Sequence, residues 1–297
     1  MIFSIIVVCL NAGEKLHVTI ESILNQTERD YEIIIKDGVS VDQATQTYLS
    51  KYRQENIANV GQDEVSGERI RVYSCKDAGI YDAMNQAISY VRGDYVFFLN
   101  CGDRFYNNKV LMQVKEQILR ADKQKGKPAQ QLAEPVTPKY IFYGNVYELK
   151  TSALVQSNPV IDDFACYRNL PCHQACFYDA ALLREKSFDT AYAVRADYEH
   201  FLWCYYRARA MTVYMPITVA CYEGGGFSET RENERKSRQE HREIVNRYMP
   251  AAKVRRYRLI MVLTFAPVRT WIAGNPVTAG IYQKIKRKLY KAQVCEK

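Results

Sequence analysis

Asn100 and Asp103 stand in a short polar turn that directly follows an apolar and aromatic run at residues 95–99. A continuous apolar run of this length is typical of a strand buried on both faces. Ligands of open α/β sheets bind beyond the carboxyl ends of the strands, where a carboxylate and a carboxamide can face a metal or a phosphate. Mg²⁺ or Mn²⁺ bridging phosphates needs only one or two protein carboxylates. The turn therefore predicts a ligand site. The alternative is an ordinary turn, because these residue types are common in turns.

Three similar apolar runs, at residues 3–10, 31–36 and 70–73, precede this one. Each is followed by a segment with helical spacing of apolar residues, so three strand–helix pairs precede the fourth strand and the Asn100 turn. Such alternation predicts parallel strands joined by right-handed helical crossovers. The runs end in small or acidic residues, which are Asn11, Asp37 and Asp77. We expect these ends to form an acidic cleft at one edge of a sheet.

The chain resembles the inverting glycosyltransferases of family 2 along about its first 225 residues. The resemblance implies an α/β GT-A fold, with a Rossmann-like, mostly parallel sheet flanked by helices. Within the family, the chain resembles the transferases of bacterial surface polysaccharides. The motifs that carry it occur in order: SIIVVCLNAGEKLHVTIESILNQT (4–27), DYEIIIKDGVSVD (30–42), KDAGIYDAMNQAI (76–88), GDYVFFLNCGDRF (93–105), CHQACFY (172–178) and RADYEHFL (195–202).

The resemblance also implies which residues bind the sugar-nucleotide donor. Asp37 would hydrogen-bond the base, for which uracil fits best, and Asn11 would line the same pocket. Asp82 and Asn85 lie three residues apart on a predicted helix, so they share a face, and they match the segment near the ribose and the donor sugar. Asn100 would complete the donor site.

The metal-binding motif departs from the family pattern. The family usually has Asp-x-Asp-Asp, whereas this chain has Asn100-Cys101-Gly102-Asp103. The usual metal-binding carboxylate therefore falls on Gly102, which has no side chain. Asp103 becomes the predicted ligand of Mg²⁺ or Mn²⁺. A resembling subgroup of polysaccharide-assembly transferases carries the same Asn-x-Gly-Asp form.

The catalytic base is expected in the second half of the chain. Inverting transfer by direct displacement needs a carboxylate that accepts the proton of the attacking hydroxyl. Asp197 matches the family's base, with Glu199 as the fallback, although an Asp at a helix start is also a common cap. His173 and Gln174 match a segment beneath the acceptor site. The alternative for His173 is a structural role.

Composition fits one large enzyme domain. The chain has 297 residues, 47% of them hydrophobic, and a net charge of +8. We expect a GT-A domain at residues 1–225, with a nucleotide-sugar half at 1–105 and an acceptor half at 106–225. We expect residues 226–297 to form a charged helical and basic amphipathic C-terminal extension. Nine scattered cysteines and the lack of a secretory signal predict a cytoplasmic protein with reduced thiols.

The extension holds most of the positive charge, because residues 251–297 contain eleven Lys and Arg but one Glu. Its apolar stretch is too short to span a bilayer. Basic and aromatic residues around that stretch favour contact with an anionic membrane surface, on the inner face of the membrane. The alternative is a basic helix pair packed on the protein itself. No nucleic-acid motif accompanies the charge, so nucleic acid is not an expected partner.

The predicted function is transfer of a sugar, of hexosyl or N-acetylhexosaminyl type, from a nucleotide donor to a glycan or lipid-linked glycan. Two alternatives stay open. A nucleotidyltransferase would have similar topology, but it normally carries a phosphate loop rich in glycine and basic residues after the first strand. A non-catalytic module that binds sugar nucleotides or glycans is the other, because Gly102 stands at the usual metal position.

Overall fold

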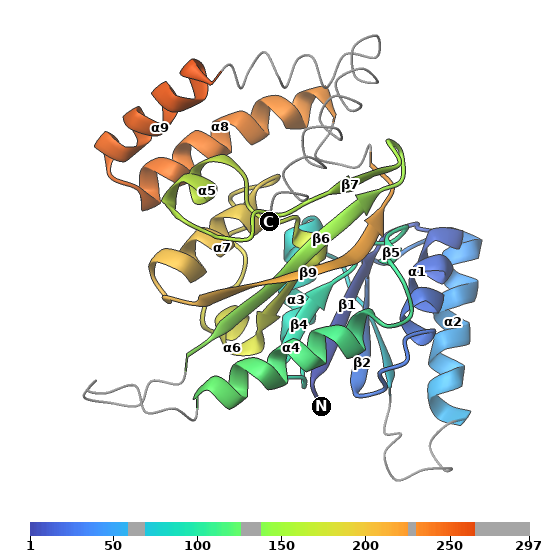
Figure 1. Cartoon of the computed structure of the whole chain (residues 1–297). Coiled ribbons are helices and arrows are strands. Elements are labelled where there is room, and N and C mark those ends of the chain that lie inside the picture. Colours follow the sequence, from blue (N-terminus) through green and yellow to red (C-terminus); the bar gives the residue numbers. More distant parts are fainter. Residues whose placement is uncertain (59–68, 126–137, 225–229, 265–297) are drawn as a thin grey trace. The chain divides into compact units, whose positions relative to one another are not determined.

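The computed structural model describes residues 1–58, 69–125, 138–224 and 230–264 (Figure 1). In chain order the elements are β1 (Phe3–Cys9), α1 (Glu14–Leu24), β2 (Tyr31–Asp37), α2 (Gln43–Ala58), β3 (Ile70–Ser74), α3 (Ile80–Ile88), β4 (Tyr95–Phe98), β5 (Arg104–Phe105), α4 (Val110–Lys125), β6 (Tyr140–Glu148), β7 (Ala153–Val155), α5 (Asp163–Arg168), η1 (His173–Ala175), β8 (Cys176–Asp179), α6 (Ala180–Glu185), α7 (Ala196–Tyr206), β9 (Met211–Tyr222), α8 (Arg231–Tyr248) and α9 (Ala251–Leu263).

The first four strands form the predicted parallel arrangement. Their order is β3-β2-β1-β4, and every neighbouring pair is parallel. Adjacent residues of β1 point to opposite faces of the sheet, yet Ile5 and Ile6 are both buried. Burial of both faces explains why these strands are apolar without alternation. The carboxyl ends of the four strands therefore meet at one edge, as the sequence predicts.

The sheet continues with strands from the second half, in the order β8-β6-β9-β5, and β7 pairs with β6. Here β8 is antiparallel to β4 and to β6, whereas β6 and β9 are parallel. The short strand β5 pairs antiparallel with the end of β9, where Arg104 faces Cys221. This pairing brings the end of β9 beside the Asn100 turn.

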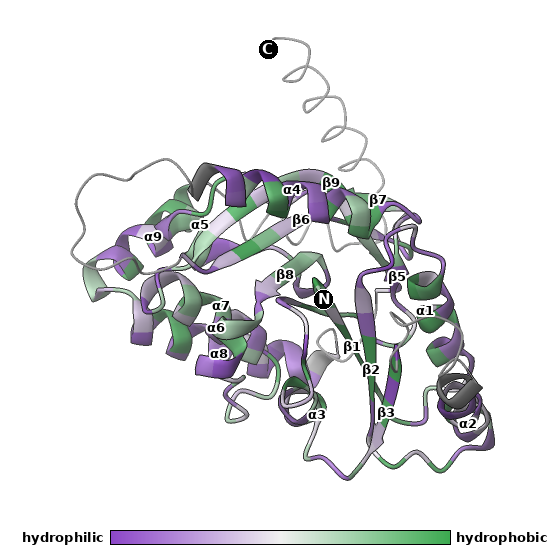
Figure 2. Ribbon diagram, turned by 90° about the horizontal axis from the view of Figure 1, so that it is seen from below, coloured by the Kyte–Doolittle hydropathy of each residue, from purple (hydrophilic) through white to green (hydrophobic). Residues whose placement is uncertain are grey.

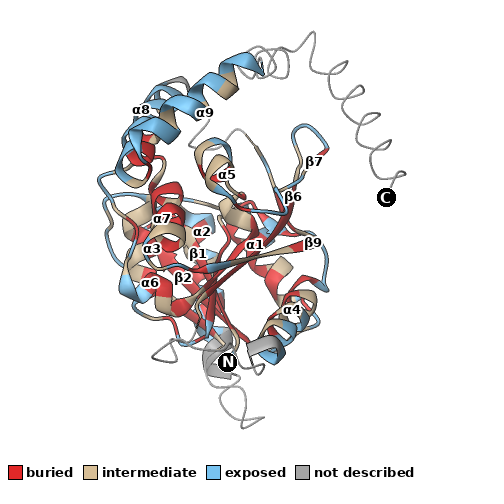
Figure 3. Cartoon of the chain, turned by 60° about the vertical axis from the view of Figure 1, so that its left-hand side comes forward, coloured by how far each residue is buried: buried red, intermediate tan, exposed pale blue. Residues whose placement is uncertain are grey.

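Helices cover the sheet and bury its apolar side chains (Figure 1). Leu16 and Ile20 of α1, and Val110 and Val114 of α4, join one core cluster with residues of β1, β2 and β4. In Figure 2 apolar colour runs along β1 and β2, whereas α4 carries bands of both colours. Figure 3 shows the strands largely buried and α8 largely exposed. This distribution is that of an α/β domain whose sheet forms the core.

The chain divides into two compact units, residues 1–244 and 245–297. The first contains the whole sheet and most of α8. The described part of the second contains α9, which has no buried residue and exposes Leu259, Val262 and Leu263. Residues 265–297 of the predicted basic extension lie outside the described residues. Within the described ranges, no helix combines the length and the apolar character that crossing a membrane requires.

Candidate functional site

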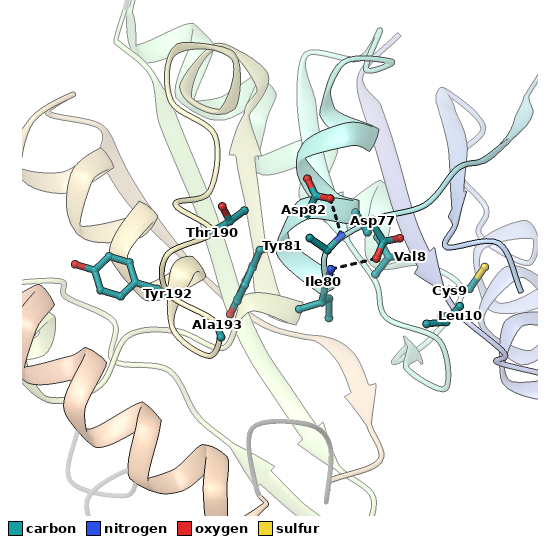
Figure 4. Close-up of a pocket in the computed structure, with 13 residues that line it drawn as sticks. Val8, Cys9, Leu10, Asp77, Ile80, Tyr81, Asp82, Thr190, Tyr192 and Ala193 are labelled. Carbon is teal, nitrogen blue, oxygen red and sulfur yellow. Dashed lines mark hydrogen bonds between the residues drawn. The ribbon is translucent and has the colours of Figure 1, made fainter.

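A cavity of about 520 Å³ lies at the carboxyl end of the parallel strands and is called the first cavity here. Its wall comes from three places: the end of β1, the turn that starts α3, and the loop before α7 that carries Thr190 and Tyr192. Figure 4 shows these groups from right to left, with the start of α3 between the other two. Of the strand-end residues that the sequence predicts at a ligand site, Asp77 lines this cavity, whereas Asn11, Asp37, Asn100 and Asp103 are not part of its wall.

Two aspartates at the start of α3 line the first cavity. Asp82 accepts a hydrogen bond from the Ala78 backbone N–H at 2.8 Å, and Asp77 accepts one from Gly79 at 3.2 Å (Figure 4). Lys36, which is 0% exposed, donates to the Cys75 carbonyl and pairs with Asp77 at 2.9 Å. The sequence reasoning missed Lys36, although a lysine inside an apolar strand signals a buried ion pair.

Asp37 and Asn11 organise the loops beside the first cavity. Asp37 is fully buried, and its Oδ1 accepts from the backbone N–H and the hydroxyl of Ser40 at 3.0 and 2.6 Å. Its Oδ2 is inaccessible and has no hydrogen-bond partner within the described ranges. Asn11 accepts from the Val41 N–H at 2.8 Å and so ties the loop after β1 to the loop after β2. This carboxylate oxygen lacks a donor, which a ligand N–H would supply if the loops around Asp37 opened to admit it.

The structure separates the two α3 residues that were predicted to act together. Asp82 lines the first cavity, whereas the side-chain amide of Asn85 makes two hydrogen bonds to the Phe188 backbone, at 2.8 and 2.9 Å. Those bonds tie α3 to the loop that follows α6. Asn85 is absent from the lining of the first cavity, so its donor-binding role stays a prediction while its structural role is visible.

The Asn100 turn is held by a threonine of α1. Thr19 donates to the Asp103 carbonyl at 2.7 Å and accepts from the Gly102 N–H at 2.9 Å. Asp103 is 7% exposed, and Gln174 donates to its carboxylate at 3.2 Å. Burial raises the pKa of Asp103 to about 6. The Oδ1 of Asn100 is inaccessible and has no partner among the residues described.

The donor atoms at this turn suit a hard divalent cation. Asp103 offers carboxylate oxygens and Asn100 an unpaired amide oxygen, and Mg²⁺ and Mn²⁺ prefer oxygen ligands. Across the described part of the chain, no group of three or more His, Cys, Asp and Glu residues is arranged to hold a metal. A cation would thus depend on few protein ligands here, which is the usual arrangement when a nucleotide phosphate supplies the others.

A second cavity of about 230 Å³ contains Asp197 and His173. Asp197 lies in the first turn of α7, and its Oδ1 accepts from the Tyr81 hydroxyl at 2.9 Å. Tyr81 itself lines the first cavity (Figure 4). The hydrogen bond between these side chains therefore connects the two cavities. The sequence reasoning missed Tyr81, whose signal was its place within the matched KDAGIYDAMNQAI segment.

The two predicted acceptor residues face different neighbours. His173 lines the second cavity and packs against Phe98, with ring centroids 5.0 Å apart. Both of its ring nitrogens are inaccessible and lack a hydrogen-bond partner in the described chain, and burial lowers its pKa. Gln174 points instead to Asp103. The histidine is therefore neutral at pH 7, and the glutamine belongs to the Asn100 turn.

Glu199 occupies a structural position. Its side chain is fully buried and forms an ion pair with Lys186. It lines neither of the two cavities. This geometry gives no support to Glu199 as a fallback base, because its carboxylate has no route to an acceptor hydroxyl. The sequence could not reveal this, since helical spacing alone does not say which face of α7 packs inward.

Glu240 of α8 is a further residue that the sequence reasoning missed. It is 4% exposed and accepts hydrogen bonds from the backbone N–H groups of Ala193, Val194 and Arg195, at 2.9, 3.0 and 2.8 Å. These three residues join the wall of the first cavity to the start of α7. The charged pattern of residues 229–247 indicates only a solvated helix, so one buried glutamate in it leaves no separate signal.

Residues 4–122 match the model of a protein family described as "Glycosyl transferase family 2". A "PGL/p-HBAD biosynthesis glycosyltransferase" of Mycobacterium bovis strain BCG is 30% identical over 77% of this chain and 79% of its own length. An uncharacterized glycosyltransferase of Mycobacterium tuberculosis is 29% identical over 73% of this chain and 72% of its own.

Two solved structures show the same fold at low identity. Staphylococcus aureus TarS, residues 1–349, in complex with UDP, superposes with a TM-score of 0.60 at 16% identity, over 86% of this chain and 69% of that one. The mannosyltransferase PcManGT of Pyrobaculum calidifontis, in complex with GDP-Man and Mn²⁺, gives 0.57 at 16% identity, over 98% and 81%. These likenesses confirm the predicted α/β GT-A fold.

Proposed function

Because the chain belongs to glycosyltransferase family 2, we propose that it moves a sugar from a nucleoside diphosphate to an acceptor hydroxyl with inversion of configuration. The hydrogen bond from Tyr81 to Asp197 carries this proposal. It places a carboxylate of the second cavity against a wall residue of the first. A donor in the first cavity and an acceptor in the second would then meet at Asp197.

Three of the predicted donor residues, Asp37, Asn11 and Asp82, have a place in this scheme. The unpaired Oδ2 of Asp37 would accept an N–H of the base, and a UDP-sugar is the proposed donor because the family resemblance favours uracil, which carries such a group. Asn11 holds the adjoining loop, and Asp82, which lines the first cavity, is the proposed contact of the ribose and the donor sugar. Neighbours of the same fold hold UDP or GDP-Man, which supports a nucleotide ligand and leaves the base to experiment.

The proposed transfer is a direct displacement. The acceptor oxygen forms a bond to the anomeric carbon as the bond to the diphosphate breaks, and Asp197 accepts the acceptor's proton. Mg²⁺ or Mn²⁺, held by Asp103, would offset the negative charge that grows on the leaving diphosphate. His173, neutral and in the second cavity, would contact the acceptor, whereas Gln174 would keep Asp103 in place.

The proposed acceptor is a glycan or a lipid-linked glycan of the cell surface, presented at the cytoplasmic face of the membrane. Lys253, Arg255, Arg256 and Arg258 make α9 basic, and Leu259 is exposed beside them. The positive charge of this helix suits an anionic lipid surface. Flotation of the full chain with anionic liposomes, lost after truncation at Pro250, would support the contact. Equal flotation of both forms would reject it.

A ligand screen tests the proposed function first. Thermal shifts of the protein are measured with UDP, GDP, dTDP, CDP, ATP and NAD, each with and without Mn²⁺. Selective stabilisation by one nucleoside diphosphate is expected, because a ligand that binds only the native state raises the melting temperature. Stabilisation by nucleoside triphosphates alone would favour a nucleotidyltransferase. Binding of a sugar nucleotide without turnover, in the presence of acceptor-containing membranes, would favour a non-catalytic module.

A further inference from the structure

The backbone explains why the family's usual carboxylate is missing at Gly102. Gly102 has φ +96°, in the region that strongly favours glycine. An aspartate at this position would need a strained backbone. The turn of this chain therefore cannot carry a side-chain ligand at residue 102, and any second carboxylate must come from another element.

Glu223 supplies a carboxylate at that place. A Cβ added to Gly102 would lie 3.2 Å from the Cδ of Glu223 and 3.3 and 3.4 Å from its two oxygens. Strand pairing causes this proximity, because Arg104 of β5 faces Cys221 of β9 in an antiparallel register. In the same antiparallel register, Gly102, two residues before Arg104, lies opposite Glu223, two residues after Cys221. The carboxylate thus fills the space that a side chain at residue 102 would occupy.

A cationic group already lies at this carboxylate. The ammonium of Lys15, at the start of α1, contacts Glu223 at 2.5 Å. Glu223 is 47% exposed and Lys15 56% exposed, so solvent and ions can reach the pair. In the same turn the Oδ1 of Asn100 is inaccessible and unpaired among the described residues. The carboxylate of Glu223 therefore lies beside the Asn100 turn, at a place that already attracts a positive charge.

We propose that Glu223 is a second oxygen ligand of the divalent cation, beside Asp103, and that it replaces the carboxylate that Gly102 cannot carry. This inference rests on the proposed function, because the cation is the one that accompanies the nucleoside diphosphate. It assigns a role to a residue outside every motif of the sequence resemblance. It also accounts for a turn that lacks the family's usual ligand and still suits a metal.

Calorimetric titration of UDP, with and without Mn²⁺, tests the assignment without an assay of turnover. In the wild type, Mn²⁺ is expected to tighten UDP binding. Glu223→Gln should reduce this effect of Mn²⁺ about tenfold or more, since loss of even an outer partner of a metal ligand typically costs 10–100-fold in metal affinity. UDP affinity in the absence of Mn²⁺ should not fall. Unfolding curves verify that the variant is folded.

Two control variants separate a metal ligand from an ordinary surface ion pair. Lys15→Met removes the partner of Glu223 and should keep the Mn²⁺ effect, whereas an ion-pair role predicts that both variants behave alike. Glu185→Gln breaks an ion pair of similar exposure with Lys139 and should behave as the wild type.

The outcomes are distinguishable. A wild-type Mn²⁺ effect in Glu223→Gln, an equal loss in Lys15→Met, or UDP binding that ignores Mn²⁺ would overturn the role of Glu223 and leave the proposed function standing. A wild type that binds no nucleoside diphosphate would overturn the proposed function and this inference together.

Discussion

The polar groups of the two cavities are held in different ways. In the first cavity, backbone N–H groups two and four residues away bond Asp77 and Asp82, and Asp77 also pairs with Lys36, 41 residues away. In the second, Asp197 is held by Tyr81, which is 116 residues away. The loop that leads to Asp197 is held by Glu240, at least 45 residues away.

This difference indicates which substitutions should lower turnover without lowering nucleotide affinity. A site built from local turns survives changes elsewhere in the fold, because its geometry depends on a few neighbouring peptide groups. A residue placed by distant elements moves when any of those elements is altered. We therefore expect substitutions at the partners of Asp197 to lower turnover more than they lower nucleotide affinity.

The largest expected effect comes from Asp197→Asn. Loss of a general base typically costs 10²- to 10⁴-fold in rate, and a fall of about 10³-fold in turnover is expected. Nucleotide affinity should not change, because Asp197 is not part of the first cavity wall. Release of nucleoside diphosphate in the presence of acceptor-containing membranes measures turnover, and calorimetry measures affinity. Asp162→Asn, at a helix cap that Asn also fits, is the control. Near-normal turnover of Asp197→Asn would refute the assignment.

Glu240→Ala should have the next largest effect. Three backbone N–H groups lose a charged, buried acceptor, and hydrogen bonds to charged groups contribute about 1.5–3 kcal/mol each. Because water can replace part of this loss, we expect the free energy of unfolding to fall by about 3 kcal/mol. Turnover should fall more than UDP affinity does. Urea unfolding measures the first quantity.

The matched control for Glu240 lies on the same helix. Glu243 is exposed and accepts a hydrogen bond from Gln239, one turn earlier in α8, at 2.9 Å. Glu243→Ala should change the free energy of unfolding by less than about 0.5 kcal/mol. Equal effects of the two variants would mean that Glu240 acts through helix propensity, and the distinction between local and distant support would fail.

Acid should weaken the fold through His200 in the second half. Burial, aided by the charge of Lys186, lowers the pKa of His200 to about 3, whereas an unfolded histidine titrates near 6.5. Between these values only the unfolded state binds the proton, so the free energy of unfolding falls as the pH falls. The slope is about 1.4 kcal/mol per pH unit for one group.

His200→Gln isolates this contribution. The side-chain amide can keep the hydrogen bond to the Lys186 carbonyl, which His200 makes at 2.9 Å, but it does not titrate. The difference in unfolding free energy between wild type and variant should therefore shrink as the pH falls from 6 to 4. Asp103 acts with the opposite sign, because its raised pKa stabilises the native state at low pH. The difference between wild type and variant cancels the contribution of Asp103, because both proteins contain Asp103. Parallel curves would contradict the prediction.

The same contrast explains what the sequence could predict. The strand ends at Asn11, Asp37 and Asn100 were predictable, because apolar runs and turn residues are local signals that a parallel sheet gathers at one edge. The neighbour of Gly102 was not predictable, since it depends on the register of two antiparallel strands more than 100 residues apart. The buried state of Glu199 was equally hidden, because it follows from the packing of α7.

Tyr81→Phe is expected to have the smallest effect of these variants, and it tests the connection between the cavities most directly. The Tyr81 hydroxyl has one hydrogen and two acceptors at 2.9 Å, Asp197 Oδ1 and the Val194 carbonyl. Its removal keeps the ring in the wall of the first cavity, so UDP affinity should hold. Turnover should fall roughly tenfold, the equivalent of about one hydrogen bond.

A second buried tyrosine shows whether any such fall is specific. Tyr143 donates to the Asn158 carbonyl at 2.8 Å and lines neither cavity. Tyr143→Phe should cost similar stability and leave turnover unchanged, since its hydroxyl supports no group of the site. If both variants lowered turnover equally, the loss would reflect a weaker fold. A loss confined to Tyr81→Phe would mean that a residue of the first cavity positions the base of the second.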